Sequence, residues 1–207
     1  MAIPTILVTP PEQRALLVLA HGAGAGMRHP FLEQFAQVLA ARGVGTLRYE
    51  FAYMEAKKHR VDPPAVAAAR VREAVAEAAK AAPGIPLFAG GKSFGGRMTS
   101  TAQAETPLEG VRGLVFVGFP LHPPERPGTE RAAHLDGVQV PMLFLQGTRD
   151  EFARPDLLNP VIASLGARAV LSLVDGADHG FKVKGRKPAE VMADLAERTE
   201  AWLFARS

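Results

Sequence analysis

The segment Gly90-Gly91-Lys92-Ser93-Phe94-Gly95-Gly96-Arg97 joins a short apolar run, residues 87–89, to a stretch that can form a helix. Serine at the centre of this pattern fits a sharp strand-to-helix turn, because Gly91 and Gly95 leave the room that such a turn requires. The turn presents the serine hydroxyl to solvent and aims the first N–H groups of the helix at an incoming carbonyl oxygen. The segment therefore predicts a strand, a nucleophile elbow at Ser93 and a following helix.

Two other glycine-based sites are excluded by spacing. A phosphate-binding loop that ended in Gly91-Lys92-Ser93 would need glycine at position 86, where this chain has proline. Proline fixes φ and removes a backbone donor, so that loop cannot form here. The stretch Gly22–Met27 resembles a dinucleotide fingerprint, but methionine stands where the third glycine is needed.

Short apolar runs alternate with helical patterns along the whole chain. Strands are predicted at residues 15–20, 44–48, 87–89, 113–119, 142–145 and 169–174, with a possible edge strand at 3–8. Helices are predicted at residues 30–41, 62–82, 93–103, 156–165 and 188–204, with Asp62 and Pro63 as cap and first turn of the second. This alternation predicts an α/β fold: a mostly parallel, doubly wound sheet of about six to seven strands with helices on both faces.

Length and composition favour one globular domain over residues 1–207. The absence of cysteine excludes a cysteine nucleophile, disulfides and thiolate metal sites. Neither a leader segment nor an apolar run long enough to span a membrane is visible, so a cytoplasmic protein is expected. A net charge of +3 gives no support for nucleic-acid binding. We expect a monomer or homodimer that acts on a small-molecule substrate, without nucleic acid or membrane.

A serine nucleophile needs a base, and the base needs an acid to orient it. In a sheet built around a nucleophile elbow, the chain order is serine, then the acid, then histidine. Asp150 follows the predicted strand at 142–145, and His179 follows the predicted strand at 169–174. Ser93, Asp150 and His179 thus occur in the required order, each at a strand end, and are the predicted catalytic residues.

Other acids compete with Asp150 for this role. Glu151 is its neighbour, and Asp175 and Asp178 lie close to the histidine in sequence. Asp178 directly precedes His179, so its side chain would point away from the ring. Asp150 is therefore preferred as the acid.

The negative charge that develops on the substrate oxygen requires two N–H donors. One is predicted to be the backbone N–H of Phe94, the residue after the nucleophile. The other is expected from the loop after the strand at 15–20, with Ala23 preferred, and with Gly22 and Gly24 as possible donors that also bind the substrate. The large ring of Phe94 is expected at the mouth of the pocket.

With these residues in view, the chain resembles an α/β-hydrolase over nearly its whole length. It is more narrowly similar to the small, lidless, dienelactone-hydrolase-like group that includes a chromatin-complex subunit and a testis-expressed homologue. The resemblance rests on the segments His21-Gly22-Ala23-Gly24, Arg48–Met54, Gly90–Ser93, Leu145–Asp150 and Asp178-His179. It implies the hydrolase fold and the triad, but no particular substrate.

The resulting hypothesis is a serine hydrolase that cleaves a small ester, thioester or lactone through an acyl-enzyme, with neither metal nor organic cofactor. The alternative is a non-catalytic binding or scaffold protein on the same fold, since fold does not determine function. The irregular segment 121–137 is too short for a large lid. A short acyl group is therefore expected.

Overall fold

The computed structural model describes residues 3–207, and its seven strands form one sheet in the order β1-β3-β2-β4-β5-β6-β7. The strands are β1 (Thr5–Val8), β2 (Ala15–Ala20), β3 (Val44–Tyr49), β4 (Leu87–Lys92), β5 (Val111–Val117), β6 (Met142–Gly147) and β7 (Ala169–Val174). Only β1 pairs antiparallel, with β3, and the other neighbouring pairs are parallel. The predicted sheet is confirmed, including its edge strand. Residues 1 and 2 of the predicted domain lie outside the described residues.

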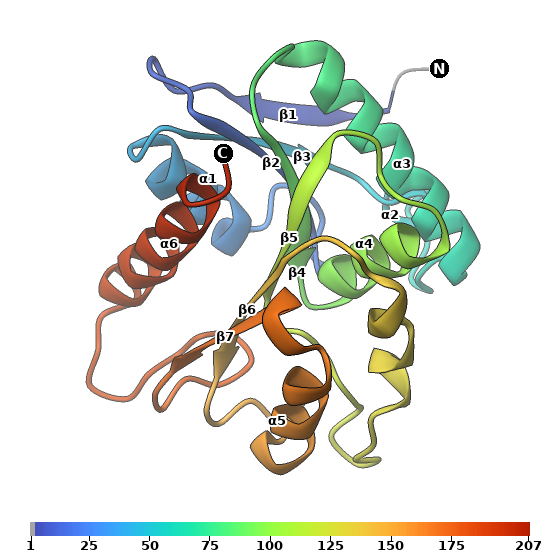
Figure 1. Ribbon diagram of the computed structural model, residues 1–207, viewed down its shortest axis with the longest axis vertical. Helices are drawn as coiled ribbons and strands as arrows, with labels where there is room; N and C mark the ends of the chain where they lie inside the picture. Colours follow the sequence, from blue (N-terminus) through green and yellow to red (C-terminus); the bar gives the residue numbers. More distant parts are fainter. Residues whose placement is uncertain (1–2) are drawn as a thin grey trace.

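Helices cover both faces of the sheet (Figure 1). They are α1 (Pro30–Ala40), α2 (Ala52–Glu55), α3 (Pro64–Ala81), α4 (Phe94–Glu105), α5 (Pro155–Ser164) and α6 (Pro188–Phe204), with short 3-10 helices η1 (Glu130–Gly137) and η2 (Gly166–Arg168). One face packs against α1 and α6, and the opposite face packs against α3, α4, η1 and α5. This is the α/β-hydrolase fold with its doubly wound sheet.

Burial on both faces explains why the sequences of the central strands are continuously apolar. Alternate residues of a strand point to opposite faces. In β2, Leu16 and Val18 join the core beneath α3 and α4, whereas Leu17 and Leu19 join the core beneath α1 and α6. Because both faces are covered, no position of β2 faces water.

One local feature differs from the sequence-based expectation. Helix α3 begins at Pro64 with Pro63 at its N-cap position, and no side chain caps it. The predicted cap, Asp62, is wrong because its carboxylate accepts a hydrogen bond of 3.0 Å from the backbone N–H of Tyr53 in α2. As expected, segment 121–137 forms no large lid: it contains η1, whose Ala132 and Leu135 are buried in the core.

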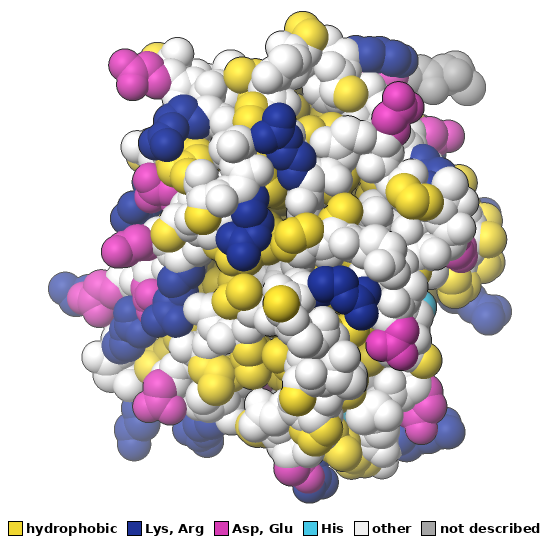
Figure 2. Space-filling model, in the orientation of Figure 1, with side chains coloured by type: hydrophobic (Ala, Val, Ile, Leu, Met, Phe, Trp, Pro, Cys, Tyr) yellow, Lys and Arg dark blue, Asp and Glu magenta, His cyan; other side chains and the backbone are white. Residues whose placement is uncertain are grey.

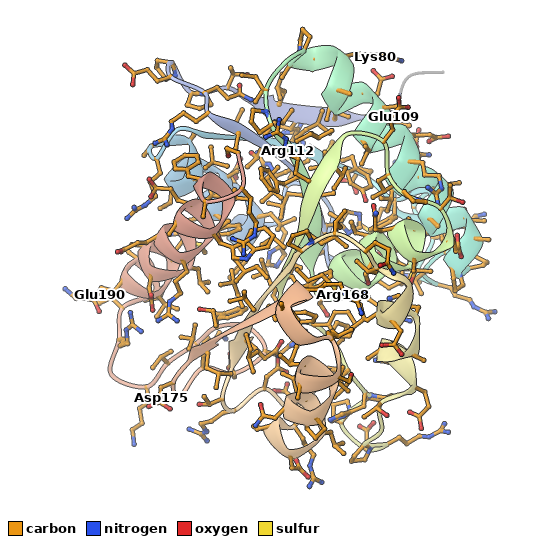
Figure 3. All side chains as sticks on the ribbon, in the orientation of Figure 1. Lys80, Glu109, Arg112, Arg168, Asp175 and Glu190 are labelled. Atoms are coloured by element: carbon orange, nitrogen blue, oxygen red, sulfur yellow. The ribbon has the colours of Figure 1, made fainter. Side chains whose placement is uncertain are left out.

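The parallel strands end at a common edge of the sheet, where the loops after β4, β6 and β7 meet. In Figure 3, Asp175 marks the carboxyl end of β7, while Arg168 and Arg112 mark the opposite, amino ends of β7 and β5. Basic and acidic side chains are interspersed on the face shown in Figure 2, with apolar side chains between them. Among residues 3–207, no helix has both the length and the apolarity to cross a membrane.

Candidate active site

Ser93 occupies a strained turn between β4 and α4. Its φ of 50° and ψ of −118° place it among only three non-glycine residues of the described chain with positive φ. Such a conformation costs about 1–3 kcal/mol and is held only where the surroundings enforce it. Here β5 contributes, because the N–H of Ser93 donates to the carbonyl oxygen of Val117 at 3.1 Å. The predicted elbow geometry is present.

The glycines on either side of Ser93 allow two chain segments to approach closely. A Cβ atom on Gly91 would lie 2.5 Å from the carbonyl oxygen of Ala20, and one on Gly95 would lie 2.5 Å from that of His21. Both distances are too short for any side chain. The end of β2 therefore lies directly against the turn, which brings the loop after β2 next to Ser93.

Ser93, His179 and Asp150 form a continuous chain of hydrogen bonds from three separate loops. The Oγ of Ser93 lies 2.8 Å from Nε2 of His179, and Nδ1 of His179 lies 2.8 Å from Oδ2 of Asp150. A carboxylate only accepts, so Nδ1 carries the proton and Nε2 is free to accept from the serine hydroxyl. This arrangement allows the histidine to take the serine proton.

The carboxylate of Asp150 is buried and fully partnered. It accepts from His179, from the N–H of Phe152 at 2.8 Å and from the side-chain amide of Gln146. The side-chain oxygen of Gln146 in turn accepts from the N–H of Phe119 at 2.9 Å. Gln146 thus ties the acid to the end of β5, a role that sequence reasoning missed.

Two of the three competing acids have other partners. Asp178 accepts a 2.8 Å hydrogen bond from the N–H of Lys182 within its own loop. Asp175 accepts from the hydroxyl of Thr148 at 3.2 Å. Within residues 3–207, no hydrogen bond or ion pair joins either of these carboxylates or Glu151 to the ring of His179.

The N–H groups predicted to face the substrate oxygen lie at the start of α4 and in the loop after β2. Among the described residues, the N–H groups of Phe94 and Ala23 have no hydrogen-bond partner. The N–H of Gly24 is already engaged, because it donates to the hydroxyl of Tyr53 at 2.8 Å. Gly22 and Ala23 line the cavity next to Ser93.

Buried side chains hold the loop after β2 in place. Nδ1 of His21 donates to the carbonyl oxygen of Gly22 at 2.8 Å, and its Nε2 accepts from the N–H of Phe51 at 3.1 Å. Burial lowers the pKa of His21, which favours the neutral ring that these two bonds require. His21 and Tyr53 together hold this loop in place, a supporting role that no sequence pattern indicated.

The ring of Phe94 does not lie at the pocket mouth, contrary to the sequence-based expectation. It is 7% exposed and packs edge-on against Phe51, with ring centroids 5.2 Å apart, and against Tyr53 at 6.4 Å. The reason is the direction of α4, whose first turn points this side chain toward the core beneath α3. The ring that covers His179 is instead Phe152, at a centroid distance of 4.4 Å.

Lys92 places a cation beside the triad. Its Nζ donates to the backbone carbonyl oxygen of His179 at 2.7 Å and lies 5.5 Å and 6.0 Å from the ring centroids of Phe181 and Phe31. Burial lowers the pKa of Lys92 to about 8, although Asp150 opposes the shift. The sequence did not predict this contact between Lys92 and the loop that carries His179.

A cavity of about 890 Å³ opens at Ser93 and His179 and is bordered by the amino-terminal halves of α1 and α6. Its walls are predominantly apolar, as is usual for sites that bind small molecules. Among residues 3–207, no group of three or more His, Asp or Glu side chains is arranged to hold a metal ion.

Residues 13–203 match a family of known proteins described as an alpha/beta hydrolase domain. The structure is similar to a dienelactone hydrolase from Anabaena variabilis, with a TM-score of 0.77 and 21% identity over 98% of this chain and 91% of that one. An alpha-beta serine hydrolase homologue from Coxiella burnetii has a TM-score of 0.77 and 18% identity, with coverage of 96% and 90%. A lidless a/b serine hydrolase from Xanthomonas campestris has a TM-score of 0.74 and 20% identity, with coverage of 96% and 88%. At these identities the similarity establishes the fold.

Proposed function

The chain belongs to the alpha/beta hydrolase domain family, and on that premise we propose that it is a serine hydrolase that cleaves a small ester, thioester or lactone. The observation that carries the proposal is the continuous hydrogen-bond chain from the strained Ser93 through His179 to the buried Asp150. Ser93 and His179 line a cavity, so the serine hydroxyl at the end of these hydrogen bonds is accessible to a substrate. Similar folds in a dienelactone hydrolase and in a lidless a/b serine hydrolase support the proposal.

In the first half of the reaction, Ser93 Oγ attacks the substrate carbonyl carbon while Nε2 of His179 takes its proton. Asp150 holds the Nδ1 proton in place and stabilises the positive charge that the ring acquires. The N–H groups of Phe94 and Ala23 donate to the oxyanion of the tetrahedral intermediate. His179 then returns the proton to the leaving oxygen or sulfur, and the C–O or C–S bond breaks to give the acyl-enzyme.

In the second half, water replaces the leaving group. His179 takes a proton from this water as it attacks the acyl carbon, and the same two N–H groups stabilise the second oxyanion. Return of the proton to Ser93 Oγ releases the carboxylic acid and restores the starting state. For a lactone, the released alcohol and acid remain parts of one molecule.

Labelling by a fluorophosphonate tests the proposal, because this reagent reacts with an activated serine. We expect covalent labelling of the wild-type protein at Ser93, seen by mass spectrometry, and none in Ser93→Ala or His179→Ala. Ser164→Ala is the matched control, since this serine is exposed on α5, and it should be labelled as wild type is. An unlabelled wild-type protein would favour the alternative, a binding or scaffold protein on the same fold.

A further inference from the structure

Lys92 is the last residue of β4 and directly precedes the nucleophile. Alternate residues of a strand share a face, so its side chain lies on the same face of the sheet as Phe88, which packs beneath α1 and α6. There Nζ lies 6.0 Å from the ring centroid of Phe31 and 5.5 Å from that of Phe181, and it donates to the carbonyl oxygen of His179 at 2.7 Å. One side chain thus joins the strand that carries the nucleophile to the loop that carries the base.

Two glycines leave the room that this side chain needs. A Cβ atom on Gly118, the residue after β5, would lie 3.0 Å from Nζ of Lys92 and 3.5 Å from both Nδ1 and Cε1 of His179. Gly118 has a φ of 69°, a conformation that favours glycine. A Cβ atom on Gly22, in the loop after β2, would lie 3.8 Å from Cγ of Lys92. The amine and the ring of His179 therefore border the same small space.

The amine is charged over the pH range in which an imidazole ordinarily titrates. Burial lowers the pKa of Lys92 to about 8, although the carboxylates of Asp150, Asp178 and Glu151 raise it. These three acids come from the loops after β6 and β7, the same two loops that hold the acid and the base of the triad. At neutral and mildly acidic pH, an ammonium ion therefore lies beside the ring of His179.

The other cations at the cavity have less influence on this ring. Lys182 also lines the cavity, but its side chain is exposed, so water and salt screen its charge. The guanidinium of Arg186 lies 3.4 Å from the carboxylate of Asp194, which offsets its charge. Lys92 is thus the cation that can act on the base through a direct contact.

We propose that Lys92 is a positioning residue for the base: its hydrogen bond holds the loop of His179 against the nucleophile strand, and its charge keeps the ring neutral. A nearby like charge disfavours the protonated ring, so the ring stays able to accept the proton of Ser93 at lower pH. Once the ring has taken that proton, Asp150 stabilises its charge. The inference rests on the proposed function and adds a residue to its machinery.

The pH dependence of hydrolysis tests the proposal. Phenyl acetate serves as the substrate, because it is neutral, and kcat and KM are measured between about pH 5 and 9. Lys92→Met keeps an apolar side chain of similar length but has neither charge nor donor. We expect kcat to fall by about 10- to 100-fold with KM changed by less than about threefold, because the variant misplaces the base.

The same variant should change the pH profile. The pH at which kcat/KM is half-maximal on the acid side should rise by about 0.5–2 units, since removal of the cation favours the protonated ring. A loss of packing alone would not move this midpoint. A kcat within about threefold of wild type, or a midpoint that stays in place, would overturn the proposal.

Three further variants isolate the charge. Lys184→Met is the matched control, because Lys184 is exposed on the same loop as His179, and its kcat and midpoint should equal those of wild type. Lys92→Arg keeps the charge, so its midpoint should stay at the wild-type value whatever its kcat. A midpoint that moves as far in Lys92→Arg as in Lys92→Met would contradict the proposal. If thermal unfolding shows that Lys92→Met does not fold, Lys92→Gln, which is also neutral, takes its place with the same expected shift.

Labelling by fluorophosphonate separates the two possible failures. If wild-type Ser93 is labelled and phenyl acetate is cleaved, but Lys92→Met keeps its rate and its midpoint, the inference about Lys92 is wrong and the proposed function stands. If Ser93 is not labelled and the ester is not cleaved, the proposed function fails and the inference fails with it.

Discussion

Nζ of Lys92 donates a 2.7 Å hydrogen bond to the backbone carbonyl oxygen of His179. The residue before the nucleophile thereby holds the loop that carries the base, across 87 positions of sequence. Only one of its three N–H donors has this partner, and burial penalises its charge. The contact orders the site at a cost in stability that depends on pH.

Lys92→Met should reveal that cost. The pKa of Lys92 is lowered from 10.5 to about 8, so between these pH values the unfolded chain binds a proton that the folded chain does not. Wild-type stability therefore rises, relative to the variant, as pH increases from 8 to 10.5, by up to about 3 kcal/mol. Urea unfolding of both proteins at several pH values measures this difference. A gap that stays constant over the range would show that the buried amine does not titrate there.

Asp150→Asn should reduce kcat by about 10⁴-fold, because the amide would favour the wrong tautomer of His179. Asp178→Asn is the control. Among the described residues its carboxylate accepts only from the N–H of Lys182, so kcat should change by less than about tenfold. Steady-state kinetics on one activated ester compare the two variants. A larger loss in Asp178→Asn would assign the acid to the wrong residue.

Gly95→Ala should destabilise the fold by about 3 kcal/mol or more, because its Cβ atom would lie 2.5 Å from a backbone oxygen that cannot move freely. Gly137→Ala provides the comparison, since there the nearest atom is 3.4 Å away and stability should change by less than about 0.5 kcal/mol. Chemical denaturation gives both values. Equal stability of the two variants would mean that β2 does not press against the elbow as described.

Tyr53→Phe removes the acceptor of the Gly24 N–H and should lower stability by about 1–3 kcal/mol. If the loop after β2 contributes an oxyanion donor, kcat and kcat/KM should fall together, because that contact is made in the transition state. Tyr49→Phe is the matched control, since in the described part of the chain no hydrogen bond joins its buried hydroxyl to the loop after β2. A change confined to KM in Tyr53→Phe would argue against the positioning role.

The local patterns of the sequence determined the sheet, the elbow and the order of the predicted catalytic residues. Apolar runs mark buried strands whatever their neighbours are, and Gly91 and Gly95 mark a turn with no room for side chains. Because parallel strands end at one edge, Asp150 and His179 could be assigned to the same region as Ser93 from chain order alone. These features depend on residues close together in the chain.

Only the tertiary structure decided which groups support the site and what the site can hold. Gln146 contacts Asp150 four residues away, but its orientation depends on Phe119, which follows β5. Asp62 was predicted to cap α3, but its carboxylate accepts a hydrogen bond from the N–H of Tyr53 instead. The cavity requires α1 and α6, which lie far apart in sequence, to pack side by side on one face of the sheet. Such contacts arise from packing between distant segments, and no local periodicity encodes them.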